Sequence, residues 1–372
     1  MSSDLIVLSH QRWDGAWGRV HHIVSRLARG RTTWFVEEPR PGPVDRPRFV
    51  RRDDGGITRL WLEVPIGSPG DFGATAHLHR QQLVDLVGPG GSGAGERIVW
   101  MCTALAADVA SQLGADVVIY DAVDQPGPSG LVSPDTATAR KAALTDADVV
   151  LTGSSSQHRS VIEQGRPDAY LVADGVDPEH FASARSRRPG GDRGRPVAAY
   201  VGPIDRRIDL ALVAALAEQL PAWRIWMVGP IDGLDPTSLP WAGNLHHMGP
   251  KPYAELPGLL AGVDVAIIPF SVGAATAPPS GTNTLEYLAA GLPVVSTPVS
   301  DVVTQFGTLV DVQDDAGAFA GACNAALRHD ARRRHRRVAP LLRRRHWDVV
   351  VDEIRRILGD AGTRPPLEDL LA

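Results

Sequence analysis

The chain has 372 residues, of which 43% are hydrophobic and 22% charged, and its formal net charge is −5. A chain of this length exceeds what one hydrophobic core usually serves, so two domains are expected. The acidic balance argues against a nucleic-acid binder that works through overall positive charge. No apolar run approaches the ~18 residues that span a membrane. Cys102 and Cys323, the two cysteines, both lie in apolar segments, which favours a reducing, cytoplasmic compartment.

Short runs of β-branched and apolar residues alternate with helical patterns in the first half of the chain. The runs predict strands at residues 5–8, 33–36, 98–101, 117–120, 149–152 and 170–172. After the first strand, apolar residues from Val20 to Ala28 recur at helical spacing. Strands that alternate with helices indicate a parallel sheet, so this half is predicted to be an α/β domain.

A second series of strands follows a stretch rich in Ser, Arg, Gly and Pro at residues 184–196, which we interpret as a linker. Its strands are predicted at residues 197–201, 225–228, 245–248, 265–268, 294–297 and 308–310. The predicted organisation is an N-terminal domain (1–183), the linker, a C-terminal domain (197–342), and a C-terminal helix and tail (343–372). Both domains are predicted to be Rossmann-like and doubly wound, and such sheets bind ligands at the carboxyl ends of their strands.

The segment from Ser280 to Glu286 carries the most informative pattern. A polar loop with Gly281 opens a helix at Thr282 and Asn283, and a glycine and a proline end that helix before a buried strand. A helix start offers free backbone N–H groups and the positive end of the helix dipole, which suits a diphosphate. One turn into the helix, Glu286 can accept hydrogen bonds from two ribose hydroxyls. The alternative is that Glu286 merely stabilises its own helix.

This segment resembles the donor-binding stretch of GT-B glycosyltransferases of the group 1, family 4-like type, in which a Glu is followed by small residues, Gly and a Pro-Val pair. Residues 174–181, 200–207, 227–230 and 248–250 resemble further segments of that family. The chain is similar to a divergent branch, because Pro278 stands where many retaining members have a second Glu, and Asn283 where a related subset has Lys. The resemblance implies the GT-B fold, with two Rossmann-like domains facing a central cleft.

The resemblance also implies how the donor is bound. The backbone of Thr282 and Asn283 would bind the diphosphate, and Glu286 the ribose. Arg207, and with it Arg206, would balance phosphate charge, because a guanidinium bonds phosphate oxygens in pairs. The implied donor-binding residues are Gly18, Gly202, Arg206, Arg207, Gly229, Pro230, Gly249, Ser280, Gly281, Thr282, Asn283 and Glu286.

The acceptor is expected to lie mainly against the N-terminal domain, at the loop after the first strand. Trp13 and Trp17 are predicted to form a platform on which a sugar stacks, with packing as the alternative for at least one of them. Arg19 and His22 follow at the start of the helix and are candidates to face the acceptor.

Asp121 and Asp124 follow a later strand of the N-terminal domain and are the candidate catalytic residues. In an inverting mechanism, a carboxylate near the acceptor hydroxyl would act as the general base. In a retaining mechanism it would only orient hydroxyls, and Asp124 capping a helix is a third interpretation. Neither a metal nor another cofactor is expected, since Asp146 and Asp148, which match the Asp-x-Asp metal pattern, precede their strand instead of following it.

The arginine-rich run at residues 328–345 has two interpretations. A solvated helix face is favoured over contact with anionic lipid. The expected location is therefore the cytoplasm, with peripheral attachment to a membrane as the alternative.

These features predict a hexosyltransferase that moves a sugar from a nucleoside-diphosphate sugar, with UDP favoured, to an acceptor. Small natural-product, lipid-linked and polysaccharide acceptors are all compatible with the pattern, and no nucleic-acid partner is expected. Two other classes share the features: a GT-B epimerase or phosphorylase, and a non-catalytic subunit that binds nucleotide sugars.

Overall fold

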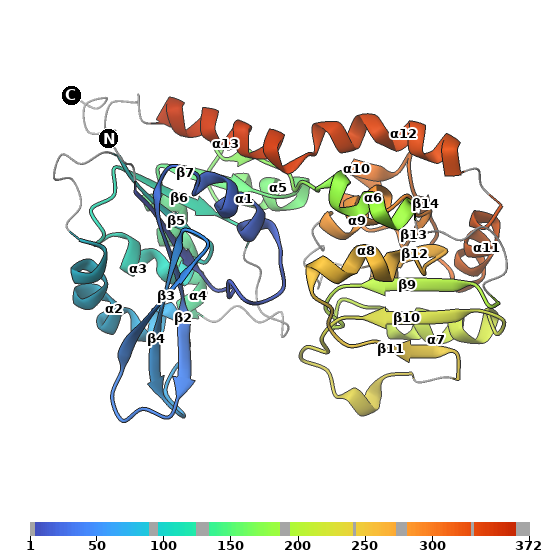
Figure 1. Cartoon of the computed structure of the whole chain (residues 1–372), viewed down its shortest axis with the longest axis horizontal. Coiled ribbons are helices and arrows are strands. Elements are labelled where there is room, and N and C mark those ends of the chain that lie inside the picture. The colour runs from blue at the N-terminus through green and yellow to red at the C-terminus, as the bar shows by residue number, and fades with distance from the viewer. Residues whose placement is uncertain are drawn as a thin grey trace. The chain divides into compact units, whose positions relative to one another are not determined.

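The computed structural model describes residues 4–88, 96–123, 134–186, 194–240, 243–272, 281–328 and 331–361. The chain forms two compact units, each with its own sheet (Figure 1). Among the described residues, the first unit contains residues 4–123, 134–173 and 348–361, and the second contains the residues from 174 to 347.

The first unit is built on a mixed sheet that has, over the described residues, the strand order β3-β4-β2-β1-β5-β6-β7-β8. Neighbouring strands are parallel except β3 and β4, which form an antiparallel hairpin. The chain winds outward in both directions from β1, so the sheet is doubly wound with a switch point between β1 and β5. The strands are β1 (Asp4–Ser9), β2 (Thr32–Gly42), β3 (Arg48–Asp54), β4 (Ile57–Pro65), β5 (Arg97–Met101), β6 (Val117–Asp121), β7 (Val149–Thr152) and β8 (Tyr170–Leu171).

Helices cover this sheet, and its central strands are apolar because both of their faces are buried. The predicted apolar face of the first helix is confirmed, since Val20, Ile23, Val24 and Leu27 are buried. No helix in the described part of the chain is long and apolar enough to cross a membrane. The helices are α1 (Arg19–Leu27), α2 (Phe72–Val87), η1 (Ala104–Ala106), α3 (Ala107–Ala110), α4 (Pro134–Asp146), α5 (Ser155–Glu163) and α13 (Trp347–Ala361).

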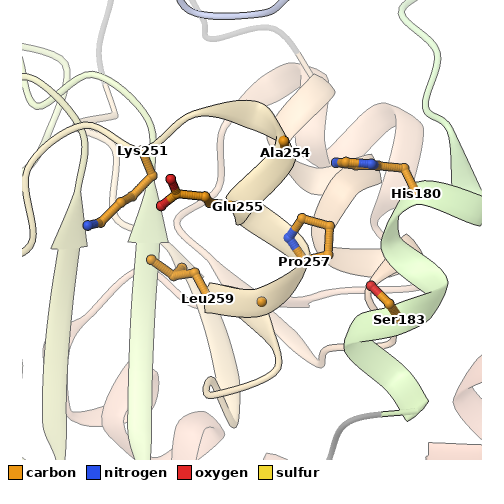
Figure 2. A pocket seen from close by; sticks show the side chains of 8 residues that line it. His180, Ser183, Lys251, Ala254, Glu255, Pro257 and Leu259 are labelled. Carbon is orange, nitrogen blue, oxygen red and sulfur yellow. The ribbon is translucent and has the colours of Figure 1, made fainter.

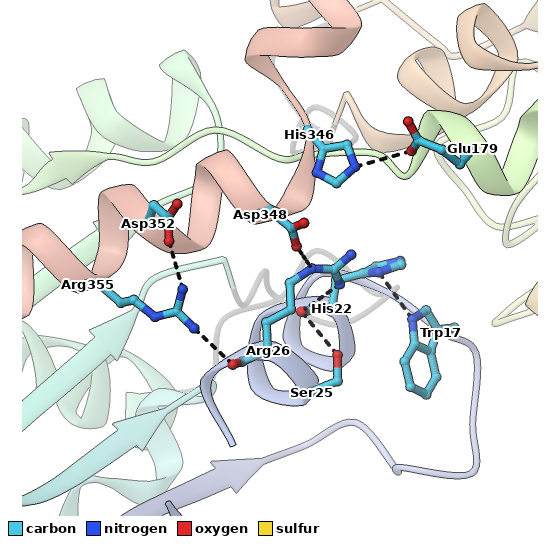
Figure 3. Close-up of polar contacts among 9 residues, drawn as sticks. All are labelled: Trp17, His22, Ser25, Arg26, Glu179, His346, Asp348, Asp352 and Arg355. Atoms are coloured by element: carbon cyan, nitrogen blue, oxygen red, sulfur yellow. Dashed lines mark hydrogen bonds and ion pairs between the residues drawn. The ribbon is translucent and has the colours of Figure 1, made fainter. Parts of the chain in front are cut away.

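The C-terminal helix α13 docks on α1 of the first unit (Figure 3). Arg26 Nε donates to Asp348 Oδ1 at 2.6 Å, and Arg355 Nη2 donates to the Arg26 carbonyl oxygen at 3.0 Å. The apolar side of α13 is buried at Val351 and Ile354. The amphipathic pattern of the tail is therefore explained by packing on a domain.

The second unit has a parallel sheet with the order β11-β10-β9-β12-β13-β14 over its described residues. Here the winding reverses between β9 and β12, which makes the carboxyl ends of these two strands the switch point. The strands are β9 (Val197–Val201), β10 (Arg224–Val228), β11 (Leu245–His247), β12 (Val265–Ile268), β13 (Val294–Ser296) and β14 (Asp311–Val312). The helices are α6 (Pro178–Ser186), α7 (Leu210–Gln219), η2 (Pro236–Ser238), η3 (Tyr253–Glu255), α8 (Leu256–Leu260), α9 (Thr282–Ala289), α10 (Ser300–Phe306), α11 (Ala316–Ala326) and α12 (Ala331–Arg344).

The predicted fold class, two doubly wound Rossmann-like sheets in tandem, is confirmed, but several local predictions differ from the structure. The hairpin of β3 and β4 was not predicted. The last strand lies at residues 311–312 instead of 308–310, because the chain after α10 first turns back, with Val310 N bonding the Phe306 carbonyl oxygen. Residues 184–186, placed in the predicted linker, belong to α6, and residues 174–183 group with the second unit.

A buried network of charges fixes the loop after β1 to the first sheet. Glu37 of β2 is fully buried, and Arg59 of β4 donates Nε to its Oε1 at 2.9 Å. The same Oε1 accepts the backbone N–H of Trp13 at 3.3 Å, and Arg59 Nη2 lies 2.9 Å from Asp14 Oδ2. Arg40 also bonds Glu37. The network therefore ties residues 13 and 14 to β2 and β4.

Glu37→Gln is expected to lower the free energy of unfolding by about 3 kcal/mol, because it removes the negative charge that balances a buried guanidinium. Urea unfolding curves measure this loss. The matched control is Glu63→Gln, which breaks a pair with the exposed Arg48 and should cost less than about 1 kcal/mol. Equal losses in the two variants would contradict a network that fixes the loop.

Candidate functional site

Glycine-containing loops follow β9, β10 and β11 at the carboxyl edge of the second sheet, and they bond to one another. Gly202 N donates to the Val228 carbonyl oxygen at 2.8 Å, and Gly229 N donates to the Gly249 carbonyl oxygen at 3.0 Å. A Cβ on Gly229 would lie 2.0 Å from the Gly202 carbonyl oxygen, and a Cβ on Gly202 would lie 2.7 Å from the Tyr200 hydroxyl. Gly229 therefore packs directly on the backbone of the neighbouring loop and Gly202 on the Tyr200 side chain, so both positions require glycine.

Helix α9 begins beside this edge, at the switch point of the sheet. The Tyr287 hydroxyl accepts the Val201 N–H at 2.7 Å and lies 3.1 Å from the Val201 carbonyl oxygen, to which it donates. The Asn283 side chain donates to the same oxygen at 2.8 Å. The N-cap is Gly281, which has no side chain to bond the amides of the first turn. These amides, which include those of Thr282 and Asn283, remain directed out of the helix start.

Glu286 lies one turn into α9 and next to a second carboxylate. It is half-buried, and burial together with the charge of Asp174 raises the pKa of Glu286 to about 8. Thr282 Oγ1 donates to Asp174 Oδ2 at 2.7 Å. The fold thus brings together two segments that the sequence places more than a hundred residues apart, and both carry residues that resemble the family.

The arginines after β9 differ in their surroundings. Arg207 is paired with Asp205, with Nη2 to Oδ2 at 2.6 Å and Nε 3.0 Å from both carboxylate oxygens. Although burial lowers it, pairing with Asp205 raises the pKa of Arg207. Arg206 is exposed. Much of the hydrogen-bonding capacity of Arg207 therefore serves Asp205, and its role in balancing phosphate charge stays a prediction.

Other predicted residues are placed as follows. Pro230 is exposed, and its carbonyl oxygen accepts the Ile204 N–H at 2.8 Å, so it helps to hold the loop after β9. Ser280 and Asp124 lie outside the described residues, as does Pro278.

In the first unit, Arg19 and Asp121 pair with each other inside the domain. Arg19 Nε donates to Asp121 Oδ2 at 3.0 Å, and Nη1 donates to the Val172 carbonyl oxygen at 2.8 Å. The two side chains are only 8% and 1% exposed. The structure therefore gives both residues a structural role, joining α1, β6 and the segment after β8. It leaves Asp121 without the access to an acceptor hydroxyl that a general base needs.

The aromatic candidates and His22 form one packed group. His22 is buried, and its Nδ1 accepts the indole N–H of Trp17 at 3.3 Å (Figure 3). Trp13 is also buried and packs on Phe35, with ring centroids 5.0 Å apart. Trp17 is half-buried. Of the four residues predicted to bind the acceptor, Trp17 is the one that keeps an accessible ring.

Gly18 is the N-cap of α1, with φ −150°, an extended conformation that any residue can adopt. A Cβ there would meet Gln11 Oε1 at 3.8 Å, an ordinary contact distance. The surrounding protein therefore does not require glycine at this position. Close approach of a ligand to the backbone is another reason for glycine at position 18.

Glu38, which the sequence analysis missed, lies within β2, where the parallel pairing with β4 shifts register between Glu37 and Arg40. Burial, and to a lesser extent the charge of Asp71, raise the pKa of Glu38 to about 7, against an opposing effect of Arg12. It is half-buried. A single Glu within a strand carries no sequence motif, so only its three-dimensional surroundings reveal the raised pKa of this carboxyl.

A pocket of about 600 Å³ lies between α6 and α8 of the second unit (Figure 2). On one side of the pocket, His180 stacks on the Tyr253 ring, with centroids 4.2 Å apart. Lys251 and Glu255 line the other side of the pocket. None of the residues predicted to bind the donor lines it, although Lys251 follows Gly249 by two positions. The candidate nucleotide site is therefore defined by α9 and the glycine loops and not by this pocket.

Comparison with known proteins shows which families and structures the chain is similar to. Residues 195–329 match the model of the family described as Glycosyl transferases group 1. TuaH of Bacillus subtilis, provisionally named as a teichuronic acid biosynthesis glycosyltransferase, is 29% identical over 204 residues. That match covers 49% of this chain and 50% of TuaH, so it spans about half the length of its relative.

Solved structures match almost the whole chain. A UDP-forming α,α-trehalose-phosphate synthase from Burkholderia xenovorans superposes with a TM-score of 0.69 at 15% identity, covering 98% of this chain and 100% of that one. Anabaena HepE in complex with UDP and glucose gives a TM-score of 0.68 at 14% identity, covering 96% of this chain and 99% of that one. The chain therefore has the GT-B fold, and residues 195–329 are similar to the group 1 glycosyltransferase family. The resemblance stated from the sequence is confirmed.

Gly229→Ala is expected to destabilise the second unit by about 1–3 kcal/mol, the usual cost of forcing extra atoms into a packed site. The added methyl group would lie against the Gly202 carbonyl oxygen. Gly243→Ala is the matched control, because a Cβ at Gly243 meets nothing within 4 Å, and its effect should stay within about 0.5 kcal/mol. Chemical unfolding of both variants measures the difference, and equal stability would show that the loops do not depend on Gly229.

Glu286→Gln is expected to be more stable than the wild type at alkaline pH. The unfolded chain releases the Glu286 proton near the ordinary pKa of 4.5, whereas the folded protein holds it to about pH 8. The wild type therefore loses stability as the pH rises between these values, and an uncharged Gln does not. We expect the variant to gain at least about 1 kcal/mol between about pH 5 and about pH 9, the free energy of roughly one pKa unit.

The free energy of unfolding, measured at both pH values for the wild type and the variant, checks this gain. Glu218→Gln, at an exposed position of α7, controls for general effects of removing a carboxylate. If the difference in the free energy of unfolding between wild type and Glu286→Gln stayed constant with pH, the pKa of Glu286 would not be raised in the folded protein.

Proposed function

We propose that this protein is a glycosyltransferase that moves a sugar from UDP to a saccharide acceptor, with the donor nucleotide bound by the second unit. The observation that carries the proposal is the start of α9, which is uncapped by a side chain and carries Glu286 one turn in, at the switch point of the sheet. In doubly wound sheets the carboxyl edge at this point is where ligands bind.

In the proposed complex, the diphosphate accepts hydrogen bonds from the backbone amides of Thr282 and Asn283 at the helix start and gains from the helix dipole. The ribose hydroxyls bond the Glu286 carboxyl, which accepts hydrogen bonds when ionised and can also donate one when protonated. The loops that contain Gly229 and Gly249 lie along the same edge of the sheet, where the rest of the nucleotide would bind.

Positive charge for the diphosphate would come from Arg206 and from the remaining donors of Arg207. The pair with Asp205 uses Nε and Nη2 of Arg207, and a guanidinium has five N–H donors, so Nη1 is left to reach a phosphate oxygen. The proposal includes no metal ion and no cofactor, since these groups together with the helix start balance the charge of the leaving UDP.

UDP is favoured as the nucleotide because structures that share the fold are described with it: the Burkholderia enzyme is UDP-forming, and HepE was solved with UDP and glucose. TuaH is named for the biosynthesis of teichuronic acid, which favours a growing polysaccharide as the acceptor over a small natural product. Both points come from relatives and enter here as parts of the proposal.

The reaction would proceed by attack of an acceptor hydroxyl oxygen on the anomeric carbon of the donor sugar while the bond to the β-phosphate oxygen breaks, and the hydroxyl proton would pass to the leaving phosphate. The helix start and the arginines would stabilise the charge that develops on the leaving UDP, and both substrates would be held in position. In the first unit, Gly18 allows close approach to the backbone and Trp17 presents an accessible ring. Asp121 is buried and paired, so the proposal assigns it no proton transfer.

A thermal-shift panel of UDP, GDP, ADP, TDP and CDP tests the nucleotide. Ligands that bind the native state raise its apparent stability, and UDP should give the largest rise. Calorimetry should show that Glu286→Ala weakens UDP binding by about 1.5–3 kcal/mol, the scale of hydrogen bonds to a charged group. Glu218→Ala should bind like the wild type.

The proposal fails if no nucleoside diphosphate raises the melting temperature, or if Glu286→Ala binds UDP unchanged. Product analysis with a UDP-sugar then separates the chemistry. Release of UDP only when a saccharide acceptor is present supports transfer, whereas conversion of the sugar nucleotide without an acceptor would identify an epimerase.

A further inference from the structure

A groove of about 430 Å³ runs beside α1 in the first unit, on the side of the turn that joins β3 and β4. This volume falls in the range of pockets that hold small ligands. We call it the α1 groove, and its lining residues are Trp13, Trp17, Ser25, Ala28, Arg29, Asp54, Gly55, Gly56 and Ile57.

One wall of the α1 groove is aromatic and held rigidly. The Trp17 ring stacks on the buried His21, with centroids 4.9 Å apart, and its N–H is bonded to His22, yet the residue remains partly exposed. Trp13 lies 5.4 Å from Trp17 and is fixed by its backbone bond to the buried Glu37. The indole surface in the groove is therefore preorganised, so a ligand would not have to order it on binding.

The opposite side of the groove is polar and open. Arg29 follows the end of α1 and is exposed, and Asp54, half exposed, lies 3.7 Å from Arg59. Gly55 and Gly56 form the turn with φ +57° and +91°, and a Cβ on either would meet nothing within 4 Å. The turn therefore presents backbone and a carboxylate to the groove without side chains that fill it.

This combination suits a pyranose ring. The axial C–H groups of such a ring form an apolar face that packs on a flat indole, whose electron-rich face attracts their partial positive charge. The ring hydroxyls both donate and accept hydrogen bonds, and Arg29 and Asp54 offer a donor and an acceptor on the other wall. A phosphate group fits less well, because the Asp54 carboxylate would repel it.

The position of the groove indicates which part of a saccharide it would hold. Trp17 precedes Gly18 at the amino end of α1, near the carboxyl end of β1, whereas Arg29 lies beyond the other end of the helix. Nine helical residues span about 13 Å. The groove thus leads along the helix and away from the carboxyl edge of the sheet, the edge at which the acceptor would react.

We propose that the α1 groove is a saccharide subsite that binds an inner sugar unit of an oligosaccharide acceptor, behind the unit that receives the new sugar. This inference rests on the proposed function for the place of the reacting unit. Binding of the saccharide itself depends on neither the donor nor turnover. A single-sugar acceptor would leave the groove empty and bind more weakly than an oligosaccharide.

The test measures binding of cellotetraose, tetra-N-acetylchitotetraose and tetragalacturonic acid to the full chain, by calorimetry and by saturation-transfer NMR. At least one of these probes should bind the wild type, and Trp17→Ala should weaken its binding about tenfold or more. Trp17→Phe, which keeps an aromatic ring, should retain most of the affinity. The matched control is Trp34→Ala, because Trp34 precedes Phe35 on β2 and so projects from the face of the sheet away from Trp13.

The outcomes separate this subsite from the proposed function. Each variant is first checked for its UDP-induced rise in melting temperature, which reports an intact second unit. The subsite is overturned if none of the three tetrasaccharides binds the wild type. It is also overturned if Trp17→Ala binds with unchanged affinity, or if Trp34→Ala loses as much affinity as Trp17→Ala. Any of these results with normal UDP binding leaves the donor site standing, whereas the absence of UDP binding overturns the proposed function and not the subsite.

Discussion

The site in the second unit depends on how the end of β9 holds the start of α9. Both backbone groups of Val201 are bonded to the Tyr287 hydroxyl, and the Asn283 side chain adds a further bond to its carbonyl oxygen. These bonds fix the helix through side chains of its own residues, and the N-cap, Gly281, has no side chain to bond the amides of the first turn. The neighbouring glycine loops bond to one another, with Gly229 N donating to the Gly249 carbonyl oxygen, and the His247 ring lies 2.8 Å from the Gly229 carbonyl oxygen. The helix start and these loops thus lie along one edge of the sheet.

The same arrangement places two carboxyl groups close together in a partly buried site, which lowers the stability of the folded protein when both are ionised. Glu286 sits beside Asp174, and burial holds its proton to a pH well above that of a free carboxyl. If Glu286 served only to stabilise its helix, a neutral residue at this position would cost no stability. Such a local conflict is typical of sites in which stability is given up for binding, and it supports a ligand role for Glu286 over simple stabilisation of the helix. The first unit shows the opposite pattern, since its buried carboxylates Glu37 and Asp121 are each paired with an arginine and serve the fold.

Hydrophobic periodicity in the sequence was sufficient to predict most strands and the division into two sheets, because buried parallel strands are almost continuously apolar. The β3 and β4 hairpin was missed because β3 is exposed and rich in arginine and aspartate, although Asp54, Gly55 and Gly56 form a recognisable turn signal. The local pair of Arg207 with Asp205 was visible in the sequence, whereas the pairing of Arg19 with Asp121 joins residues 102 positions apart and depends on the tertiary fold. Residues after a strand were correctly expected at the carboxyl edge, but which of them face outward is decided by such long-range partners.

A crystal structure of the protein with UDP would test the central claim most directly, because it shows where the nucleotide sits. The account predicts the diphosphate at the amides of Thr282 and Asn283, with ribose hydroxyls within hydrogen-bonding distance of the Glu286 carboxyl. Nucleotide bound in the first unit, or in the second unit away from α9, would contradict it.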